Sequence, residues 1–306
     1  MTEYNTVIVG GGPIGASTAY FLSQQSSQDG IALITNDPEE DPTQQVTYRY
    51  AGGSVRWFWD EDEKREATTI TAKFINELLD KGIELSALKD TYHFVYRGVH
   101  TPSLNIKSAE LVKYFLTESA KQGVTVQNDT QLESIEKSED GYILNTSKGQ
   151  IKAKKVLLAL GVNNVKYMPG LELENEKRQL FVTDVPVDEF RAKLPHTILK
   201  FDDAYGYVFL KKIDGVLKVV VGQEDLVEDE DETQAVDYYK QLMDSPFGDA
   251  MPWLKDAKVE KLLWGVDAAT KTLLIKDDGQ GLYSANCGSS VRSCVYIGQQ
   301  LSQKLI

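Results

Sequence analysis

The sequence predicts an α/β fold in two parts, one built on parallel strands and the other on a mostly antiparallel sheet. Two observations support this. A strand, a glycine-rich turn, a helix and a second strand follow one another over residues 5–35, which is the order of a parallel βαβ unit. From about residue 166, strand-like segments alternate with turns and no helix intervenes, which is typical of an antiparallel sheet.

The N-terminal unit is predicted from two buried strands and the helix between them. Residues 5–9 form an apolar strand, and residues 30–35 (GIALIT) form the second. Residues 13–25 have helical periodicity. The apolar face of this helix consists of Ala16, Ala19, Tyr20 and Leu22.

The next segments are predicted from their periodicity and end signals. Residues 36–47 form a polar loop, and residues 62–81 form a helix. A strand over 91–98 leads to a helix over 107–122, which we expect Ser108 to cap.

Short strands joined by glycine turns then fill residues 124–150 and end in a buried strand over 156–160. A chain of alternating helices and strands would instead be expected of an enzyme that binds a nicotinamide cofactor. This meander therefore favours a different dinucleotide.

The antiparallel part is predicted from three strands: QLFVTDV, YGYVFLKK and GVLKVVVGQ, at 179–185, 205–212 and 215–223. An acidic run over 227–232 is expected to form a solvent-exposed loop before a helix over 233–243. A helix over 291–305 closes the chain.

Composition restricts the classes of partner. The 306 residues are 42% hydrophobic, which suits a globular protein with a large core, and the formal net charge is -13. Such a surface repels nucleic-acid phosphates and anionic lipids, so neither is expected as a partner. No apolar run approaches the roughly 18 residues of a membrane span, and no signal peptide is recognised.

The two cysteines, Cys287 and Cys294, are seven residues apart with no histidine nearby. We expect reduced thiols in a cytoplasmic protein, with neither a disulfide nor a metal site.

The turn VIVGGGPIGAS, at 7–17, predicts a dinucleotide cradle. Gly10 allows the tight turn after the strand, Gly12 lets a pyrophosphate approach the backbone, and Gly15 lets helix and strand pack closely. The helix start, with Pro13 and Ile14, offers N–H groups and a positive dipole end to the phosphates.

In such a dinucleotide-binding unit, the second strand normally ends in an Asp or Glu whose side chain binds a ribose hydroxyl of the dinucleotide. Here Thr35 and Asn36 occupy that place, with Asp37 just beyond. A neutral hydrogen bond from Thr35 or Asn36 could replace the acid, or Asp37 could turn inward.

Four segments in order resemble the D-amino acid oxidase superfamily, in its sarcosine oxidase and glycine oxidase branch. They are the glycine turn, YRYAGGSVRWFW, KKVLLALGVNN and GLYSANCGSSVRSCVYIG. The resemblance implies a Rossmann-like FAD-binding domain of the glutathione reductase type and a mostly antiparallel substrate domain. The implied FAD-binding domain comprises 1–84, 101–165 and 266–306, and the substrate domain comprises 85–100 and 166–265.

The resemblance also implies which residues contact the cofactor. AGGSVR corresponds to a segment that passes along the flavin, TQLESIE to an adenine contact, and CGSSVR to a loop whose N–H groups face the flavin O2 and N1. An ordinary helix cap by Ser289 or Ser290 would also explain the last motif. The implied residues are Ala51, Gly52, Ser54, Val55, Arg56, Leu132, Ala159, Gly161, Gly288, Ser289, Ser290, Val291 and Arg292.

We expect FAD to be bound non-covalently. Some relatives attach flavin through a cysteine just before a segment like WGVDAATKTLLI, and here Leu263 and Trp264 occupy that neighbourhood. Cys287 is expected to be a small buried residue.

Substrate contacts are expected from arginines and tyrosines. Arg292 falls where many relatives bind a substrate carboxylate, and Arg56 is a second candidate. Tyr205 and Tyr207 flank Gly206, so they share one side of a strand. The aromatic run Trp57, Phe58 and Trp59 forms either a cavity wall or part of the core.

Relatives often use a lysine near flavin N5 to activate oxygen. Lys218 is the lysine on the corresponding strand, but Val220 falls closer to that place.

The function expected from these residues is FAD-dependent oxidation of a C–N bond in an amino acid or amine. Hydride transfer to flavin N5 gives an imine, and O2 or another acceptor reoxidises the cofactor. Two alternatives remain open: an FAD-dependent 2-hydroxy acid dehydrogenase, and a non-catalytic flavoprotein that serves as a partner module.

Overall fold

The structure is a computed structural model of the whole chain. It describes residues 1–25, 30–36, 47–51, 53–56, 62–87, 93–96, 99–168, 170–194, 199–200, 206–223, 232–269, 273–288 and 290–306.

The first sheet has a parallel centre, in the order β16-β9-β1-β2-β6. β15 joins β16 antiparallel, and β7 and β8 join β9 as an antiparallel meander. Its strands are β1 (Thr2–Val9), β2 (Ile31–Ile34), β6 (Thr125–Gln127), β7 (Leu132–Ser138), β8 (Gly141–Thr146), β9 (Gly149–Leu158), β15 (Leu274–Asp277) and β16 (Leu282–Asn286).

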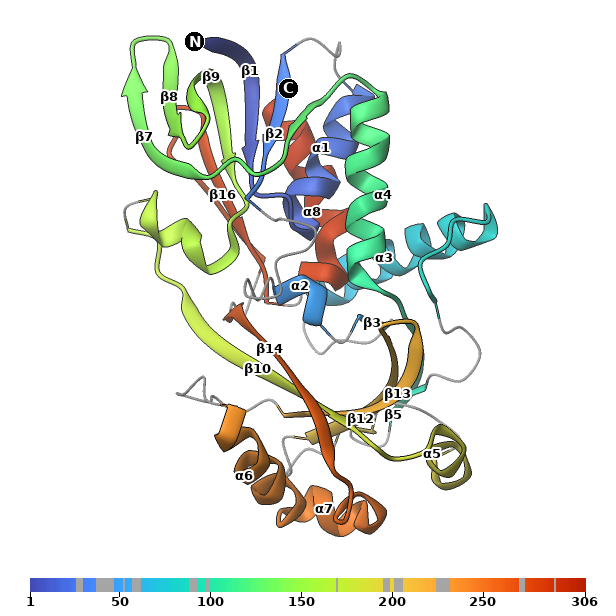
Figure 1. Cartoon of the computed structure of the whole chain (residues 1–306). Helices are drawn as coiled ribbons and strands as arrows, with labels where there is room; N and C mark the ends of the chain where they lie inside the picture. Colours follow the sequence, from blue (N-terminus) through green and yellow to red (C-terminus); the bar gives the residue numbers. More distant parts are fainter. Residues whose placement is uncertain are drawn as a thin grey trace.

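Both faces of this sheet are covered (Figure 1). Val7 and Val9 pack with the meander, and Ile8 packs with the helices on the opposite face, because successive strand residues alternate sides. The helices of this part are α1 (Pro13–Gln25), α2 (Thr47–Tyr50), α3 (Asp62–Asp80), α4 (Ser108–Lys121) and α8 (Ser290–Leu305).

α1 and α8 pack closely, although they lie at opposite ends of the sequence. A Cβ on Gly298 of α8 would come within 2.9 Å of the Ser17 backbone in α1. The Ser17 hydroxyl donates to the carbonyl of Cys294 over 2.7 Å. The C-terminal helix therefore completes the layer that the N-terminal helix begins.

The second sheet has the order β14-β10-β13-β12-β11-β4-β5-β3. Its pairs are antiparallel except β11 with β4. Its strands are β3 (Ser54–Arg56), β4 (His93–Tyr96), β5 (Val99–Asn105), β10 (Glu174–Thr183), β11 (Leu199–Lys200), β12 (Gly206–Ile213), β13 (Val216–Gln223) and β14 (Val259–Ala269).

The outer face of the second sheet is covered by short helices (Figure 1). They are α5 (Val187–Lys193), α6 (Glu232–Met243) and α7 (Pro246–Ala250). Of the two 3₁₀ turns, η2 (Pro252–Leu254) follows α7, whereas η1 (Gly161–Lys166) follows β9 of the first sheet. Phe181, Phe190 and Phe247 are buried in this core. A Cβ on Gly206 would come within 2.9 Å of both Phe247 and Leu242, so this side of β12 faces α6 and α7.

The predicted fold class, a Rossmann-like sheet with a separate antiparallel sheet, is confirmed. Sheet membership adds a detail, because β3 and β5 extend the second sheet although the residues of β3 fall within 1–84. The division into the two sets of ranges stays a prediction.

Two expected features are wrong. A helix does interrupt the antiparallel strands, because α5 lies between β10 and β11 where turns alone were expected. Ser108 is the first residue of α4 rather than its cap, and Lys107 occupies the cap position without a side-chain bond. The backbone turns one residue earlier than the sequence suggested. The acidic run at 227–232 and most of the polar loop 36–47 lie outside the described residues.

Candidate cofactor site

The glycine turn joins β1 to α1 at the carboxyl edge of the parallel strands. Gly10 has φ +111°, a conformation that side-chain-bearing residues rarely adopt. A Cβ there would also overlap the Ala159 carbonyl. Its N–H donates to the Ile34 carbonyl over 2.9 Å, so the turn is tied to β2 as well.

The other two motif glycines have different surroundings. A Cβ on Gly15 would overlap the Gly10 carbonyl, so Gly15 permits the close contact between helix and turn. A Cβ on Gly12 would have the Tyr48 ring as its nearest neighbour, at 3.8 Å. Gly12 therefore lines the cavity without being crowded, which is what a close approach of phosphate to the backbone requires.

The start of α1 is suited to an anion. The first turn of α1 carries no acidic residue, so the positive end of the helix dipole is not neutralised there. Pro13 and Ile14 of this turn line the cavity in front of it. Residues 10–14 thus present a backbone cradle with a favourable potential for a pyrophosphate.

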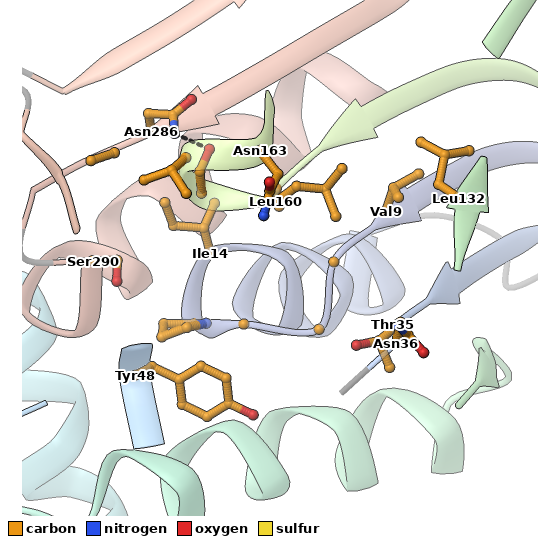
Figure 2. A pocket seen from close by; sticks show the side chains of 18 of the residues that line it. Val9, Ile14, Thr35, Asn36, Tyr48, Leu132, Leu160, Asn163, Asn286 and Ser290 are labelled. Carbon is orange, nitrogen blue, oxygen red and sulfur yellow. Dashed lines mark hydrogen bonds between the residues drawn. The ribbon is translucent and has the colours of Figure 1, made fainter. Parts of the chain in front are cut away.

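The cavity in front of the turn has a volume of about 510 Å³. Figure 2 shows it between Tyr48 of α2, Thr35 and Asn36 after β2, and Leu160 and Asn286 on the far side. The predicted cofactor residues that line it are Gly10, Gly12, Pro13, Ile14, Thr35, Asn36, Leu132, Ala159, Gly161 and Ser290.

Thr35 and Asn36 differ in what they offer a ribose. Thr35 is buried, and a Cβ on Gly11 would be 2.8 Å from its hydroxyl oxygen. Asn36 is exposed in the lining and is the better placed of the two for a neutral hydrogen bond. Asp37 lies outside the described residues.

The backbone of Leu132, the predicted adenine contact, is held in place by the Tyr167 hydroxyl, which donates to the Leu132 carbonyl over 2.8 Å.

A second group of predicted residues lies outside the described lining. Arg292 of α8 donates from Nε to the Ser54 carbonyl over 2.8 Å, so it joins α8 to β3. Val55 is buried among the helices that include α8. This group consists of Gly15, Ala51, Ser54, Val55, Gly288, Val291 and Arg292.

Lys211 of β12 approaches the same segment from the second sheet. Its Nζ donates to the Ala51 carbonyl, and the residue is only 6% exposed. Burial, together with the smaller effect of the Lys107 charge, lowers the pKa of this ammonium to about 8. Lys211 and Arg292 together hold the two ends of residues 51–54.

Tyr207 lies on the same side of β12 as Lys211, and its ring stacks on Phe209 with centroids 5.7 Å apart. It also fills the space over Gly222 of β13. Lys218, on the paired strand, forms an ion pair with Glu260 over 2.7 Å.

The remaining predicted contacts are placed only in part or not at all. The backbone of Arg56 lies in β3, but its side chain is outside the described residues. Gly52, Tyr205, Ser289 and the run 57–59 are also outside them.

Cys287 lies in the lining and is buried, with 3% of it exposed. Burial raises the pKa of its thiol to about 11, so it carries its proton at neutral pH. Both cysteines are free.

Several lining residues were not identified from the sequence: Tyr48, Asn163, Lys166, Asp267 and Asn286. Asn286 could have been found, because it ends a strand of the parallel sheet, where ligand-binding residues gather. Tyr48 and Asp267 enter the cavity from α2 and β14, and no local pattern predicts that.

The sequence is similar to that of a curated protein over about half of the chain. A curated relative, monomeric sarcosine oxidase from Bacillus sp. (strain NS-129), is 22% identical over 214 residues. That match covers 56% of this chain and spans about half of the relative's length, 55%.

Solved structures share the fold over nearly the whole chain. Glycine oxidase from Bacillus cereus ATCC 14579 has a TM-score of 0.72 at 16% identity, covering 99% of this chain and 94% of that one. L-proline dehydrogenase from P. horikoshii also has a TM-score of 0.72, at 13% identity, covering 99% and 92%.

A protein family described as FAD dependent oxidoreductase (DAO) matches residues 53–290. The glycine turn precedes this span, so its role depends on the geometry described above. The matched part is more than half of the 306 residues, and the chain therefore belongs to the DAO family of FAD-dependent oxidoreductases.

Proposed function

We propose that this protein binds FAD non-covalently and oxidises the C–N bond of an amino acid or of a primary or secondary amine. Residues 10–14 would hold the pyrophosphate, Asn36 and Thr35 the ribose, and Leu132 the adenine. The proposal is supported most by Gly12, which faces an open cavity while Gly10 and Gly15 are closely packed.

When bound, the flavin would accept a hydride at N5 from the substrate carbon next to nitrogen, leaving an imine that water hydrolyses. The protein's part is orientation and charge. Ser290, at the start of α8, lies in the lining, and backbone N–H groups at a helix start favour negative charge.

Substrate binding is proposed for the second sheet and α8. Arg292, Arg56, Tyr205 and Tyr207 are the candidates to hold a carboxylate or amine. Arg292 reaches the Ser54 carbonyl through Nε, and a guanidinium is the side chain best shaped to pair a carboxylate through two hydrogen bonds.

The test is anaerobic mixing of the FAD-loaded protein with a panel of amino acids, amines and 2-hydroxy acids while flavin absorbance is followed. Bleaching by amino acids or amines is expected. Bleaching by 2-hydroxy acids alone would replace this proposal with hydroxy acid oxidation. A protein that binds FAD and is reduced by no member of the panel would fit a non-catalytic partner role instead.

Non-covalent binding has its own test. Acid denaturation should release the yellow colour into the supernatant, and colour that stays in the pellet would contradict the proposal.

We also propose a cytoplasmic location, supported by the two free buried thiols. No helix in the described part of the chain is long and apolar enough to cross a membrane.

A further inference from the structure

A pair of buried asparagines joins two walls of the cavity. Asn164, in η1, is 0% exposed, and Asn286, at the end of β16, is 2% exposed. The Asn164 side-chain nitrogen donates to the side-chain oxygen of Asn286 over 2.7 Å. Asn286 in turn donates to the Gly161 carbonyl over 2.8 Å, the bond drawn in Figure 2.

Asn164 reaches the ends of both neighbouring strands. Its side-chain oxygen accepts from the Leu160 N–H over 2.8 Å. Its nitrogen also lies 3.2 Å from the carbonyls of Leu158, which ends β9, and of Ala285 in β16. The oxygen and the nitrogen of this amide are therefore both bonded, to backbone groups and to Asn286.

These bonds begin where the strand ladder stops. The last registered pair of β9 and β16 is Leu158 with Ser284. Beyond it the chain after β9 turns into η1 while β16 continues to Asn286, and Leu160, Gly161 and Asn286 line the cavity. Asn164 is absent from the described lining, so it affects the cavity only through the groups it holds.

We propose that Asn164 is a positioning residue for the cofactor and acts together with Asn286 as a pair. The pair keeps the wall formed by residues 160–163 at one spacing from the chain that runs from Asn286 toward Ser290. The inference rests on the proposed function, because it takes the cavity to hold FAD. Loss of the pair should loosen the cofactor and change the environment of its flavin.

The test uses Asn164→Asp, which keeps size and shape but replaces the donor with a carboxylate oxygen. That oxygen would face three acceptors, and unpaired buried polar atoms of this kind should weaken FAD binding roughly 10- to 100-fold. Asn286→Ala should weaken it to a similar degree. Asn145→Asp is the matched control, because Asn145 bonds Ser134 and Glu136 in the meander, and its FAD affinity should stay at the wild-type value.

A double variant separates a positioning role from a merely structural one. If Asn164 and Asn286 act as a pair, then Asn164→Asp should weaken FAD binding by a smaller factor in the Asn286→Ala background than in the wild type, so that the two effects are less than additive in free energy. The absorbance spectrum of the bound flavin should shift from wild type in both single variants at saturating FAD, and remain unshifted in Asn145→Asp.

The outcomes are distinguishable. Wild-type protein that fails to bind FAD would overturn the proposed function itself. Wild-type protein that binds FAD, with unchanged affinity in Asn164→Asp or with independent effects in the double variant, would overturn only this inference. If Asn164→Asp does not fold, Asn286→Ala decides alone, and an unchanged affinity and flavin spectrum in that variant would overturn the inference.

Discussion

At the scale of single residues, the three motif glycines have separable roles. Gly10 and Gly15 are enclosed by backbone, whereas Gly12 lines the cavity. The motif predicts a different role for each of the three. Their surroundings fit that prediction, with Gly10 and Gly15 serving the fold and Gly12 left beside the space where a ligand would bind.

Replacing Gly12 and Gly15 by alanine should separate these roles. Gly12→Ala should leave the free energy of unfolding of the apo-protein within about 1 kcal/mol of wild type while lowering FAD affinity at least about 10-fold. Gly15→Ala should destabilise the apo-protein by roughly 2–4 kcal/mol, because its Cβ would overlap the Gly10 carbonyl. Urea unfolding and FAD titration of both variants check this, and equal stability losses would contradict the distinction.

Lys211 should make stability depend on pH. Its pKa is lowered from 10.5 to about 8 in the folded protein, so between these values the unfolded chain binds more protons and stability rises with pH. Relative to Lys211→Met, the wild type should gain roughly 2–3 kcal/mol between pH 7 and pH 10.

Urea unfolding of wild type and Lys211→Met at several pH values measures this difference. Subtracting the two removes contributions from groups that titrate alike in both proteins. A flat difference across pH 7–10 would show that the Lys211 ammonium is not perturbed.

At the scale of elements, α8 carries much of the architecture. It packs on α1 through Gly298 and reaches β3 through Arg292. Its first residue, Ser290, lies in the cavity lining. One helix thus links the Rossmann-like part, the second sheet and the candidate site.

The close contact between α1 and α8 predicts that adding a methyl group at Gly298 destabilises the protein. Gly298→Ala should lower the free energy of unfolding by roughly 1–3 kcal/mol, because its Cβ would come within 3.0 Å of Ser17. Gln300→Ala, at an exposed position of the same helix, should change it by less than about 0.5 kcal/mol. Thermal unfolding of the two variants compares them, and similar melting temperatures would rule out close packing at Gly298.

Arg292, near the start of α8, is the residue of this helix that we expect to affect catalytic efficiency. Arg292→Ala should reduce kcat/KM for substrates that bear a carboxylate about 10-fold more than for plain amines, because a bidentate charged contact is lost. Steady-state kinetics with an amino acid and its decarboxylated amine measure this. Equal losses would leave Arg292 only the task of holding Ser54.

At the scale of the whole molecule, the sequence predicted features that depend on neighbouring residues, but not the contacts between residues far apart in the chain. The glycine turn, the meander and the antiparallel strands follow from neighbouring residues, so periodicity and turn chemistry were enough. The bonds that shape the site join residues 238 apart for Arg292 with Ser54, 160 apart for Lys211 with Ala51, and 122 apart for Asn164 with Asn286. No local pattern encodes such pairings, and the one-residue error at Ser108 shows that helix ends also depend on their surroundings.

The whole-molecule account depends on which dinucleotide the cavity selects. The most direct measurement is a fluorescence titration of the apo-protein with FAD, repeated in the presence of excess NAD+. The account predicts saturable binding of FAD, one per chain, with no displacement by NAD+. Tight NAD+ binding, or no binding of FAD by a folded apo-protein, would contradict it.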